Sequence, residues 1–459
     1  MDVTVEHERK LDAPGGFELP GLGGSPLESR VFTSVYYDTP GKSLAHAGIT
    51  FRRRTERGRS VWQLKLPSTD ARLELEEPGG PEPPEGLVRL LRIHLRDGAL
   101  APVAELRTRR RGELVSRKGT TAEVTVDEVS VMDALRVTDA FVEVEIELRA
   151  GDPRRLDAIA KDLARAGAKP ANGAPKLFRA LDLRRDEKPE DGPFETLRTR
   201  LRAQLREILA HDPGTRLGLD PESLHDMRVA VRRSRALLRA GAPLIATDTR
   251  VLSEELKWIG QVLGDVRDLD VLIERLQAEA TQLGREDARA ADGLVRTLER
   301  ERKRKRTAML KALDGERYAA LIDRLVATLD ELAPADADTT LGALAQKQMK
   351  KLRRAVDALD DDPPDEALHD LRKRGKRARY AAELADRSAI VKRAKEFQDV
   401  LGEHQDSVVA EHRLRTLGAV AKPAQALAAG RLVELERARQ ADARSSWRDA
   451  WRRLDRAAR

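Results

Sequence analysis

Hydrophobic and polar positions alternate over the first 150 residues with the two-residue period of β-strands. The alternating runs, rich in β-branched residues, span residues 3–10, 31–37, 49–55, 61–66, 72–76, 103–110, 121–127 and 141–148. Turn sequences such as Asp38-Thr39-Pro40-Gly41 separate them. Eight antiparallel strands are enough to close a barrel. Helical patterns at Gly86–Arg96 and Pro153–Ala166 predict two helices that cover its outer face.

Charged residues fall in one phase on strand after strand of this region. In the opening run, Glu6, Glu8 and Lys10 share a face. The matching sets on later strands are Arg52 with Arg54, Arg72 with Glu74 and Glu76, Glu123 with Asp127, and Glu143 with Glu145 and Glu147. One such face is typical of a strand with a solvated outside. The whole set carries both signs of charge and predicts a barrel with a polar interior, where buried charges must pair or bind metal and anions.

The period becomes helical from Phe194 onward, because leucine and alanine recur at three- and four-residue spacings. The preceding stretch is charged, contains proline and has no periodicity, so it predicts a linker at residues 184–193. We therefore expect a β domain at residues 1–183 and an all-α domain at 194–459. Breaks such as Asp212-Pro213-Gly214 divide the second domain into helices.

The α domain contains an internal repeat. The segment Leu224-His225-Asp226-Met227-Arg228 corresponds to Leu368-His369-Asp370-Leu371-Arg372, 144 residues later. Further along, Leu263-Gly264-Asp265 corresponds to Leu401-Gly402-Glu403 at an offset of 138 residues. This pattern predicts a duplicated four-helix bundle, with repeats at about 194–335 and 336–459.

Each repeat places basic residues along one stripe of a helix, backed by an apolar stripe. The stripes are His225, Arg228, Arg232 and Arg235 in the first repeat, and His369, Arg372, Lys376 and Arg379 in the second. Few acids are interleaved, unlike in an ordinary solvated helix, so the stripes predict a polyanion site. The adjacent His-Asp pairs also suggest metal or acid–base chemistry, but a pair at a helix start explains them better, because neighbours on a helix point to different faces.

Composition narrows the choice of partner and compartment. Residues 194–459 carry 53 Lys and Arg against 45 Asp and Glu, whereas residues 1–193 carry 32 against 33, so we expect an anionic partner for the helical part. Aromatic residues are only 3% of the chain, which disfavours base stacking and therefore nucleic acid. With no cysteine, any metal must bind oxygen or imidazole, and a cytoplasmic location is expected. No apolar run has transmembrane length and the N-terminus is charged, so we expect neither a membrane span nor a signal peptide.

The β domain resembles the CYTH domain of the triphosphate tunnel metalloenzymes. The motifs that carry the resemblance are Glu6-x-Glu8-x-Lys10, Tyr36-Tyr37-Asp38-Thr39-Pro40, Arg52-x-Arg54, Trp62 with Lys65, Arg72-x-Glu74-x-Glu76, Pro102 with Arg107–Arg111, Glu123-x-x-x-Asp127, Glu143-x-Glu145-x-Glu147, and Lys176. The resemblance implies an eight-stranded antiparallel tunnel that hydrolyses a triphosphate with Mg²⁺ or Mn²⁺. We assign the Tyr36–Pro40 run to a turn and not to catalysis.

The same resemblance implies roles for individual residues. Those implied to bind phosphate are Lys10, Arg52, Arg54, Lys65, either Arg109 or Arg110, and Lys176. Those implied to hold metal are Glu6, Glu8, Glu145 and Glu147, with Glu74, Glu76, Glu123, Asp127 and Glu143 as further ligands or supporting groups. The catalytic centre is then Glu6, Glu8 and Lys10. Phosphoryl transfer requires positioning and charge neutralisation above all, which this residue set supplies.

The α domain resembles the CHAD domain, a helical module commonly joined to CYTH domains. The resemblance implies that it binds inorganic polyphosphate along a basic surface, with a location at polyphosphate granules. The implied residues are His225, Arg228, Arg232, Arg233 and Arg235, then His369, Arg372, Lys376, Arg377 and Arg379, with Lys347, Lys351 and Arg354 as an extension.

Together these features predict a metal-dependent triphosphatase, with inorganic triphosphate preferred because the sequence shows no base-recognition signal. A catalytically idle tunnel on a polyphosphate-binding scaffold is the main alternative, because groups that bind a triphosphate need not cleave it. Hydrolysis of thiamine triphosphate, cyclisation of ATP and nucleic-acid binding by the helical stripes are weaker alternatives.

Overall fold

The structure is a computed structural model that describes residues 2–67, 72–96, 98–171, 176–181, 191–336 and 338–459. Residues 184–190 of the expected linker lie outside these ranges. The chain divides into two compact units. The first comprises residues 1–187 with Arg206–Met227, and the second comprises residues 188–205 with Arg228–Arg459. The two units are described separately.

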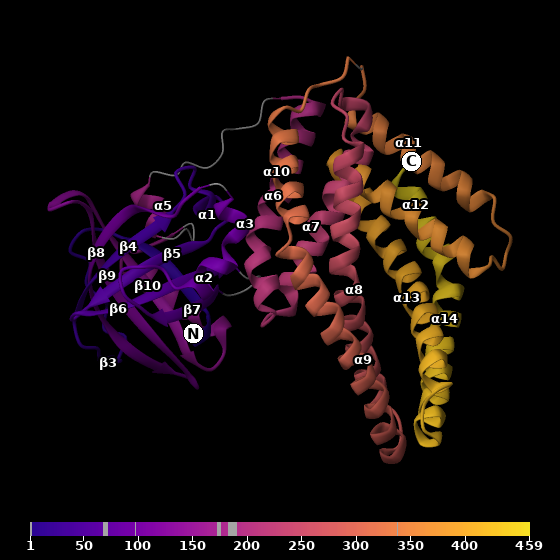
Figure 1. Ribbon diagram of the computed structural model, residues 1–459, viewed down its shortest axis with the longest axis horizontal. Coiled ribbons are helices and arrows are strands. Elements are labelled where there is room, and N and C mark those ends of the chain that lie inside the picture. The colour runs from indigo at the N-terminus through magenta and orange to yellow at the C-terminus, as the bar shows by residue number, and fades with distance from the viewer. Residues whose placement is uncertain (1, 68–71, 97, 172–175, 182–190, 337) are drawn as a thin grey trace. The chain divides into compact units, whose positions relative to one another are not determined.

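The first unit contains a continuous antiparallel sheet (Figure 1). Its strands are β1 (Asp2–Glu6), β2 (Glu8–Ala13), β3 (Ser25–Pro26), β4 (Arg30–Asp38), β5 (Thr50–Glu56), β6 (Arg59–Pro67), β7 (Arg72–Pro78), β8 (Ala101–Arg117), β9 (Thr120–Asp133), β10 (Arg136–Ala150) and β11 (Lys169–Pro170). The order is β1-β7-β6-β5-β4-β8-β9-β10-β2-β11, with β3 beside β8. Because β1 and β2 are consecutive in the chain yet pair with opposite sides of this order, the sheet closes into a barrel.

The expected antiparallel barrel is confirmed, with one difference in its opening strand. That strand divides at His7, so that β1 pairs with β7 and β2 pairs with β10. Strands in a barrel tilt and stagger, so one strand can pair with each of its neighbours over a different part of its length. The two-residue strands β3 and β11 add to the predicted set at the edges.

Helices cover the apolar outer face of the barrel, as the sequence predicts. Val124, Val144 and Ile146 point outward into a buried cluster with α4 (Leu156–Arg165). On another side, Phe51, Trp62 and neighbouring leucines pack with Leu87 and Leu91 of the segment that forms α2 (Glu85–Leu90) and α3 (Arg92–Leu95). Alternation along each strand therefore sends the apolar phase outward and the charged phase inward.

A third apolar cluster fills one end of the barrel. It contains Tyr36, Leu106, Val129 and Phe141 from the strands and Leu177 from the short helix α5 (Lys176–Ala180).

Another short helix, α1 (Ser43–His46), follows β4. The turn between them is fixed by the buried Asp38 carboxylate, which accepts hydrogen bonds from the backbone N–H groups of Thr39, Leu44 and Ala45 at 2.7–2.9 Å.

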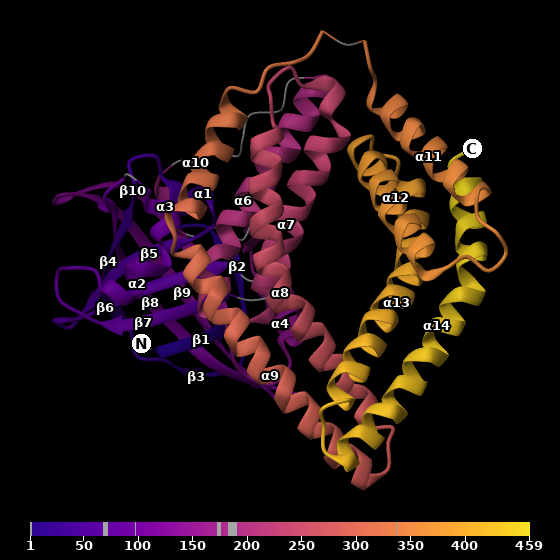
Figure 2. The ribbon, with the colours of Figure 1, turned by 45° about the vertical axis from the view of Figure 1, so that its right-hand side comes forward.

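The remaining chain is helical (Figure 2). Its helices are α6 (Pro193–Leu217), α7 (Pro221–Ala240), α8 (Arg250–Ala280), α9 (Arg285–Leu313), α10 (Glu316–Asp330), α11 (Leu341–Asp357), α12 (Asp365–Leu384), α13 (Ser388–Gly418) and α14 (Pro423–Ala457). The predicted duplication is confirmed, since α11–α14 repeat the order of α6–α9, and α10 is additional. Helices α6 and α7 contribute to both compact units. The predicted break at Pro213 is wrong, because α6 continues through this residue to Leu217.

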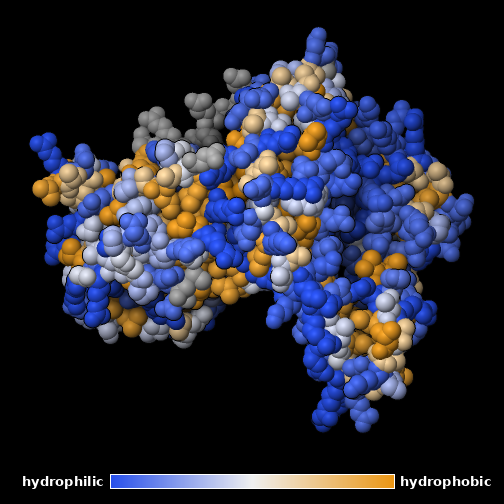
Figure 3. Space-filling model, viewed as in Figure 1, coloured by the Kyte–Doolittle hydropathy of each residue, from blue (hydrophilic) through white to orange (hydrophobic). Residues whose placement is uncertain are grey.

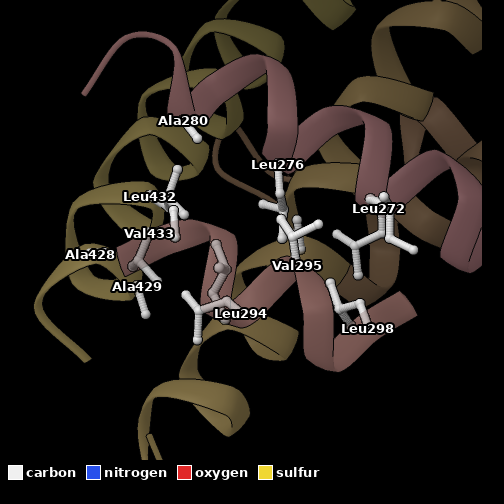
Figure 4. Packing of buried hydrophobic residues seen from close by; sticks show 14 of the residues in the cluster. Leu272, Leu276, Ala280, Leu294, Val295, Leu298, Ala428, Ala429, Leu432 and Val433 are labelled. Carbon is white, nitrogen blue, oxygen red and sulfur yellow. The ribbon is translucent and has the colours of Figure 1, made fainter. Parts of the chain in front are cut away.

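An apolar core joins the two repeats of the helical unit (Figure 4). Leu272 and Leu276 of α8 and Leu298 of α9 belong to the same buried cluster as Leu432 and Val433 of α14. The four long helices α8, α9, α13 and α14 run as two antiparallel pairs that come together at one end (Figures 1 and 2). The repeats are thus halves of one core, because neither could bury these residues alone.

Candidate functional site

The interior of the barrel holds a cavity of about 650 Å³, here termed the central cavity. The expected site residues that line it are Glu6, Glu8, Lys10, Arg52, Arg54, Lys65, Glu74, Glu76, Arg110, Glu123, Glu145, Glu147 and Lys176. They come from strands β1, β2 and β5–β10, where alternation points them inward, and from helix α5, which carries Lys176. The structure thus brings together residues that lie up to 170 positions apart in the chain.

Ion pairs cross the inner end of this cavity. Lys176 Nζ lies 2.7 Å from Asp127 Oδ2, 2.8 Å from Glu145 Oε1 and 3.1 Å from Glu143 Oε1. Lys10 Nζ lies 2.8 Å from the same Glu145 oxygen. Asp127 and Glu143 are buried beneath the cavity wall. We call the group Lys10, Arg110, Asp127, Glu143, Glu145 and Lys176 the deep charge layer.

Burial and pairing set the protonation of this layer. Burial opposes ionisation of Glu145, but Lys10, Lys176 and Arg110 outweigh it and hold the pKa of its carboxyl well below the ordinary value. Burial likewise opposes the charge on Lys10, yet its carboxylate neighbours raise the pKa of the ammonium above its usual range. Both groups therefore stay charged, since each compensates the other.

The structure settles which arginine of β8 faces the cavity. Arg110 donates two hydrogen bonds of 2.7 Å to the Asp127 carboxylate and pairs with Glu145. Arg109 is exposed on the outer side of β8 and does not line the cavity. The expectation that Arg109 binds phosphate is therefore corrected, because the two residues are neighbours in a strand and only one can point inward.

A second group of charges lies on β1, β6, β7 and β10. Lys65 Nζ is 2.6 Å from Glu6 Oε2 and 3.4 Å from Glu74 Oε1. Burial, together with the neighbouring Glu74, raises the pKa of Glu6. Burial also raises the pKa of Glu147 to about 6, against the lowering effect of Arg149. Burial, reinforced by neighbouring carboxylates, therefore disfavours the charged form of both glutamates more than Lys65 and Arg149 favour it.

That donor set fits a divalent metal. Carboxylate oxygens are the ligands that Mg²⁺ and Mn²⁺ prefer, and a metal ion would favour the ionised form that burial disfavours in Glu6 and Glu147. Among the residues that the structure describes, however, no three Asp, Glu or His side chains are already gathered closely enough to hold an ion. Glu145 in particular is bonded to lysine and arginine. Metal binding here would require these carboxylates to exchange partners.

Several cavity residues were missed by the sequence analysis. Arg52 donates to the Tyr36 hydroxyl at 2.9 Å and to Gln63 Oε1 at 2.7 Å, and both residues line the cavity. Arg54 lies over the Phe32 ring at 4.0 Å. Tyr36 thus belongs to the cavity wall as well as preceding the predicted turn. The signal was available, because Phe32 and Tyr36 share the phase of Arg30, and Gln63 shares that of Lys65.

The helical unit holds a second cavity of about 210 Å³, here termed the basic cavity. Its charged and polar lining residues are Arg232, Arg235 and Arg239 of α7, Gln348 of α11, and Lys373, Lys376, Arg377 and Tyr380 of α12. The two predicted stripes therefore face one another. Burial, reinforced by the nearby Arg372 and Arg232, lowers the pKa of Lys376 to about 7. Figure 3 shows hydrophilic residues over much of the visible face of this unit.

The repeated glycine motif positions one arginine in each half. Arg228 lies across Gly264 of α8 and pairs with Asp268 at 2.9 Å. Arg372 lies across Gly402 of α13, 3.9 Å from Asp406. The glycines leave room for the guanidinium groups, and the aspartates hold them. This geometry accounts for the second pair of matching segments in the internal repeat.

Other basic residues of the expected set lie elsewhere. Arg233 is exposed and lines a different cavity, and Arg379 pairs with Glu383 at 3.3 Å. The predicted extension on α11 does not line the basic cavity. Lys347, Lys351 and Arg354 are exposed, and Gln348 of the same helix lines the cavity instead. The histidines that begin the two stripes, His225 and His369, are half-buried.

The fold and the two sites define a protein with a charge-lined antiparallel barrel followed by a duplicated helical unit with a basic cavity. Residues 5–178 match the CYTH domain and residues 199–415 match the CHAD domain. The protein Rv2226 of Mycobacterium tuberculosis strain H37Rv is 32% identical over 456 residues, covering 89% of this chain and 88% of that protein. The chain therefore belongs to the family of proteins that join a CYTH domain to a CHAD domain.

Two solved structures resemble part of this chain. PptA from Streptomyces chartreusis matches 58% of this chain and all of its own, with 26% identity and a TM-score of 0.51. The CHAD domain from the plant Ricinus communis matches 58% of this chain and 93% of its own, with 26% identity and a TM-score of 0.46. The two domains fit a role related to triphosphate and polyphosphate. Among the described helices, none combines the length and apolar character that crossing a membrane requires.

Proposed function

We propose that the CYTH domain hydrolyses a triphosphate, with inorganic triphosphate as the preferred substrate, and depends on Mg²⁺ or Mn²⁺. The observation that supports this most strongly is the central cavity, where inward-facing cations from many strands alternate with carboxylates. Cations around an anionic phosphate chain neutralise most of its negative charge and so reduce the repulsion that the chain exerts on an attacking nucleophile. Phosphoryl transfer depends on this neutralisation more than on covalent chemistry.

The interior residues take two roles in this proposal. Lys10, Arg52, Arg54, Lys65, Arg110 and Lys176 bind phosphate oxygens. Glu6, Glu8, Glu145 and Glu147 hold metal, with Glu74, Glu76, Glu123, Asp127 and Glu143 as further ligands or as anchors for the cations. A metal bound there would neutralise phosphate charge and lower the pKa of bound water. Because Lys10, Lys65 and Lys176 already pair with carboxylates, and Arg52 is held by Tyr36 and Gln63, these cations are positioned before phosphate arrives.

We further propose that the CHAD domain binds inorganic polyphosphate in and around the basic cavity. Arg228, Arg232, Arg235, Arg372, Lys376 and Arg377 supply the charge, with His225, Arg233, His369, Arg379, Lys347, Lys351 and Arg354 on the surrounding surface. Burial and then the facing cations lower the pKa of Lys376, and a polyanion would provide a counter-charge that favours its ammonium. Binding of this kind would place the protein in the cytoplasm at polyphosphate granules.

A panel of tripolyphosphate, thiamine triphosphate and ATP tests the catalytic proposal. We expect phosphate release from tripolyphosphate that requires Mg²⁺ or Mn²⁺ and stops when the metal is chelated. Faster turnover of thiamine triphosphate or ATP would identify that compound as the preferred substrate. Formation of cyclic AMP from ATP would show that the reaction is cyclisation and not hydrolysis. No metal-dependent turnover of any of them would contradict the proposal.

A second candidate function is a polyphosphate-binding scaffold whose tunnel is idle. The pairing of Glu145 with lysine and arginine favours it, because these bonds compete with metal. In that case polyphosphate binding persists without turnover, and is lost in the Arg228→Gln/Arg232→Gln/Arg372→Gln/Lys376→Gln variant. Preference for duplex DNA over polyphosphate at matched ionic strength would instead indicate a nucleic-acid partner.

A further inference from the structure

The central cavity is closed at the end where the deep charge layer lies. Beyond this layer, Tyr36, Leu106 and Phe141 pack with Leu177 of α5 in the apolar cluster that fills this end of the barrel. Lys176, the first residue of α5, is 7% exposed and Asp127 is fully buried. A polyanion cannot cross an apolar plug, because its charge would lose hydration without compensation. Phosphate chains therefore cannot pass through this end.

The other end opens into a second space of about 550 Å³, here termed the outer cavity. The two cavities share Arg30, Arg54, Gln63 and Glu76, so they adjoin one another across these side chains. The outer cavity extends to the β5–β6 hairpin, where Arg57 and Arg59 are exposed.

Charge continues outward from the central cavity along this route. The outer cavity is lined by the arginines 30, 54, 57 and 59 against the glutamates 56 and 76, and Arg57 also pairs with Glu28 of the central-cavity lining, which together leaves one positive charge in excess. Glu56 is shared, since it pairs with Arg30 at 2.6 Å and with Arg54 at 2.9 Å. Arg59 carries no such pair among the described residues. This lining suits an extended anion that protrudes from the central cavity.

We propose that the barrel takes linear condensed phosphates longer than a triphosphate and degrades them from one end. This inference rests on the triphosphatase function proposed above. The terminal phosphates lie in the central cavity against the deep charge layer, and the phosphates behind them follow Arg30, Arg57 and Arg59 through the outer cavity. The closed end excludes internal segments, because a chain without a free end would have to thread through the apolar plug.

Each turnover in this arrangement is a balanced hydrolysis. The oxygen of one water forms a bond to a phosphorus near the chain end, and one anhydride P–O bond breaks. The electron pair of that bond stays on the bridging oxygen, which leaves as part of the other product. The two protons of the water pass to the phosphate products or to solvent. The products are a short phosphate and a chain shortened by the same amount.

The test compares a linear polyphosphate of defined length, tripolyphosphate and a cyclic polyphosphate as substrates. The variant is Arg57→Asn/Arg59→Ser, with asparagine chosen because Arg57 has a φ of 47°, a conformation that asparagine tolerates. We expect kcat/KM for the long chain to fall at least about fivefold, because charge-assisted phosphate contacts are lost, while kcat/KM for tripolyphosphate changes by less than about twofold because these exposed charges lie outside the central cavity. The matched control is Arg154→Ser/Arg155→Ser, which removes two exposed charges outside both cavities and should leave the ratio unchanged.

Product lengths complete the test. Early in the reaction we expect short phosphate and chains close to full length, and no cleavage of the cyclic substrate. Mid-length fragments, cleavage of the ring, or an unchanged ratio in the variant would overturn this inference while leaving triphosphatase activity standing. A wild-type protein without activity on tripolyphosphate would overturn the proposed function, and this inference with it.

Discussion

Pairing between individual buried cations and carboxylates fixes the positions of the side chains inside the barrel. The deep charge layer contains three cations and three carboxylates, and each cation forms an ion pair with at least one of the carboxylates. Such pairs add little net stability, because desolvation offsets their attraction, but losing one partner leaves a buried charge uncompensated. The ion pairs of this layer therefore position the cations and contribute little net stability to the fold.

Replacing Lys10 tests this balance. Lys10→Met leaves Glu145 and Glu143 short of a cation, so we expect the barrel to lose about 3–5 kcal/mol of unfolding free energy in urea. The matched double variant Lys10→Met/Glu143→Gln removes one charge of each sign and should recover part of this loss. A single variant as stable as the wild type would show that the layer is not charge-coupled.

A buried glutamate in the helical unit gives a pH-dependent prediction. Glu279 of α8 is fully buried and pairs with Arg439 at 2.8 Å, yet burial and the adjacent Glu436 raise its pKa to about 7. The folded state therefore holds its proton more tightly than the unfolded chain. Between the ordinary value of 4.5 and about 7, the free energy of unfolding should fall as pH rises, and above that range the penalty is complete.

The variant Glu279→Gln should remove that penalty. We expect its Tm to exceed that of the wild type by more at pH 8 than at pH 5, as followed by circular dichroism across this range. The comparison is internal, since both proteins share every other titrating group. A Tm difference independent of pH would contradict the raised pKa of Glu279.

At the scale of elements, the alternation of polar and apolar residues predicts the strands and their inward faces, and the helical periodicity predicts the helices. Strand alternation alone placed Glu6, Glu8 and Lys10 inward, because the side-chain direction of a strand is local. It could not choose between Arg109 and Arg110, since a run of arginines has no hydrophobic phase. Pairing across the sheet made the choice by setting Arg110 opposite Asp127.

The helical stripes show the same limit. The spacing of basic residues gave the correct face of α7 and α12, but only the packing of one helix against the next shows which cations enter a cavity. Lys376 does so and Arg379 does not. Aspartates 265, 268 and 270 lie inside α8 and pair with residues of other helices.

The facing of α7 and α12 predicts a proton-linked affinity for polyphosphate. The free protein holds the pKa of Lys376 at about 7, whereas a polyanion restores the ammonium and raises it. Binding should therefore take up a proton above pH 7, and affinity should fall between pH 7 and pH 9 by more than salt alone explains. Lys376→Met should lower affinity at pH 6 and flatten the dependence, as titration calorimetry in two buffers would show. Equal pH slopes for both proteins would contradict this assignment.

At the scale of the whole molecule, the proposed function assigns two separate sets of cations to one class of ligand. The barrel encloses its charges with carboxylates suited to metal, whereas the basic cavity has arginines and lysines with few acids. The first arrangement supports chemistry on a phosphate chain and the second supports holding one. Under the proposed function, one chain would both bind condensed phosphate and degrade it.

The most direct test of this account is metal-dependent phosphate release from tripolyphosphate by Glu6→Gln/Glu8→Gln. Its matched control is Glu77→Gln/Glu82→Gln, which changes two glutamates of the same unit that do not line the central cavity. We expect the control to keep wild-type activity and the cavity variant to lose at least about a hundredfold in kcat, since metal ligands are removed. Equal activity in the two variants, with both folded, would contradict the assignment of the barrel interior as the catalytic site.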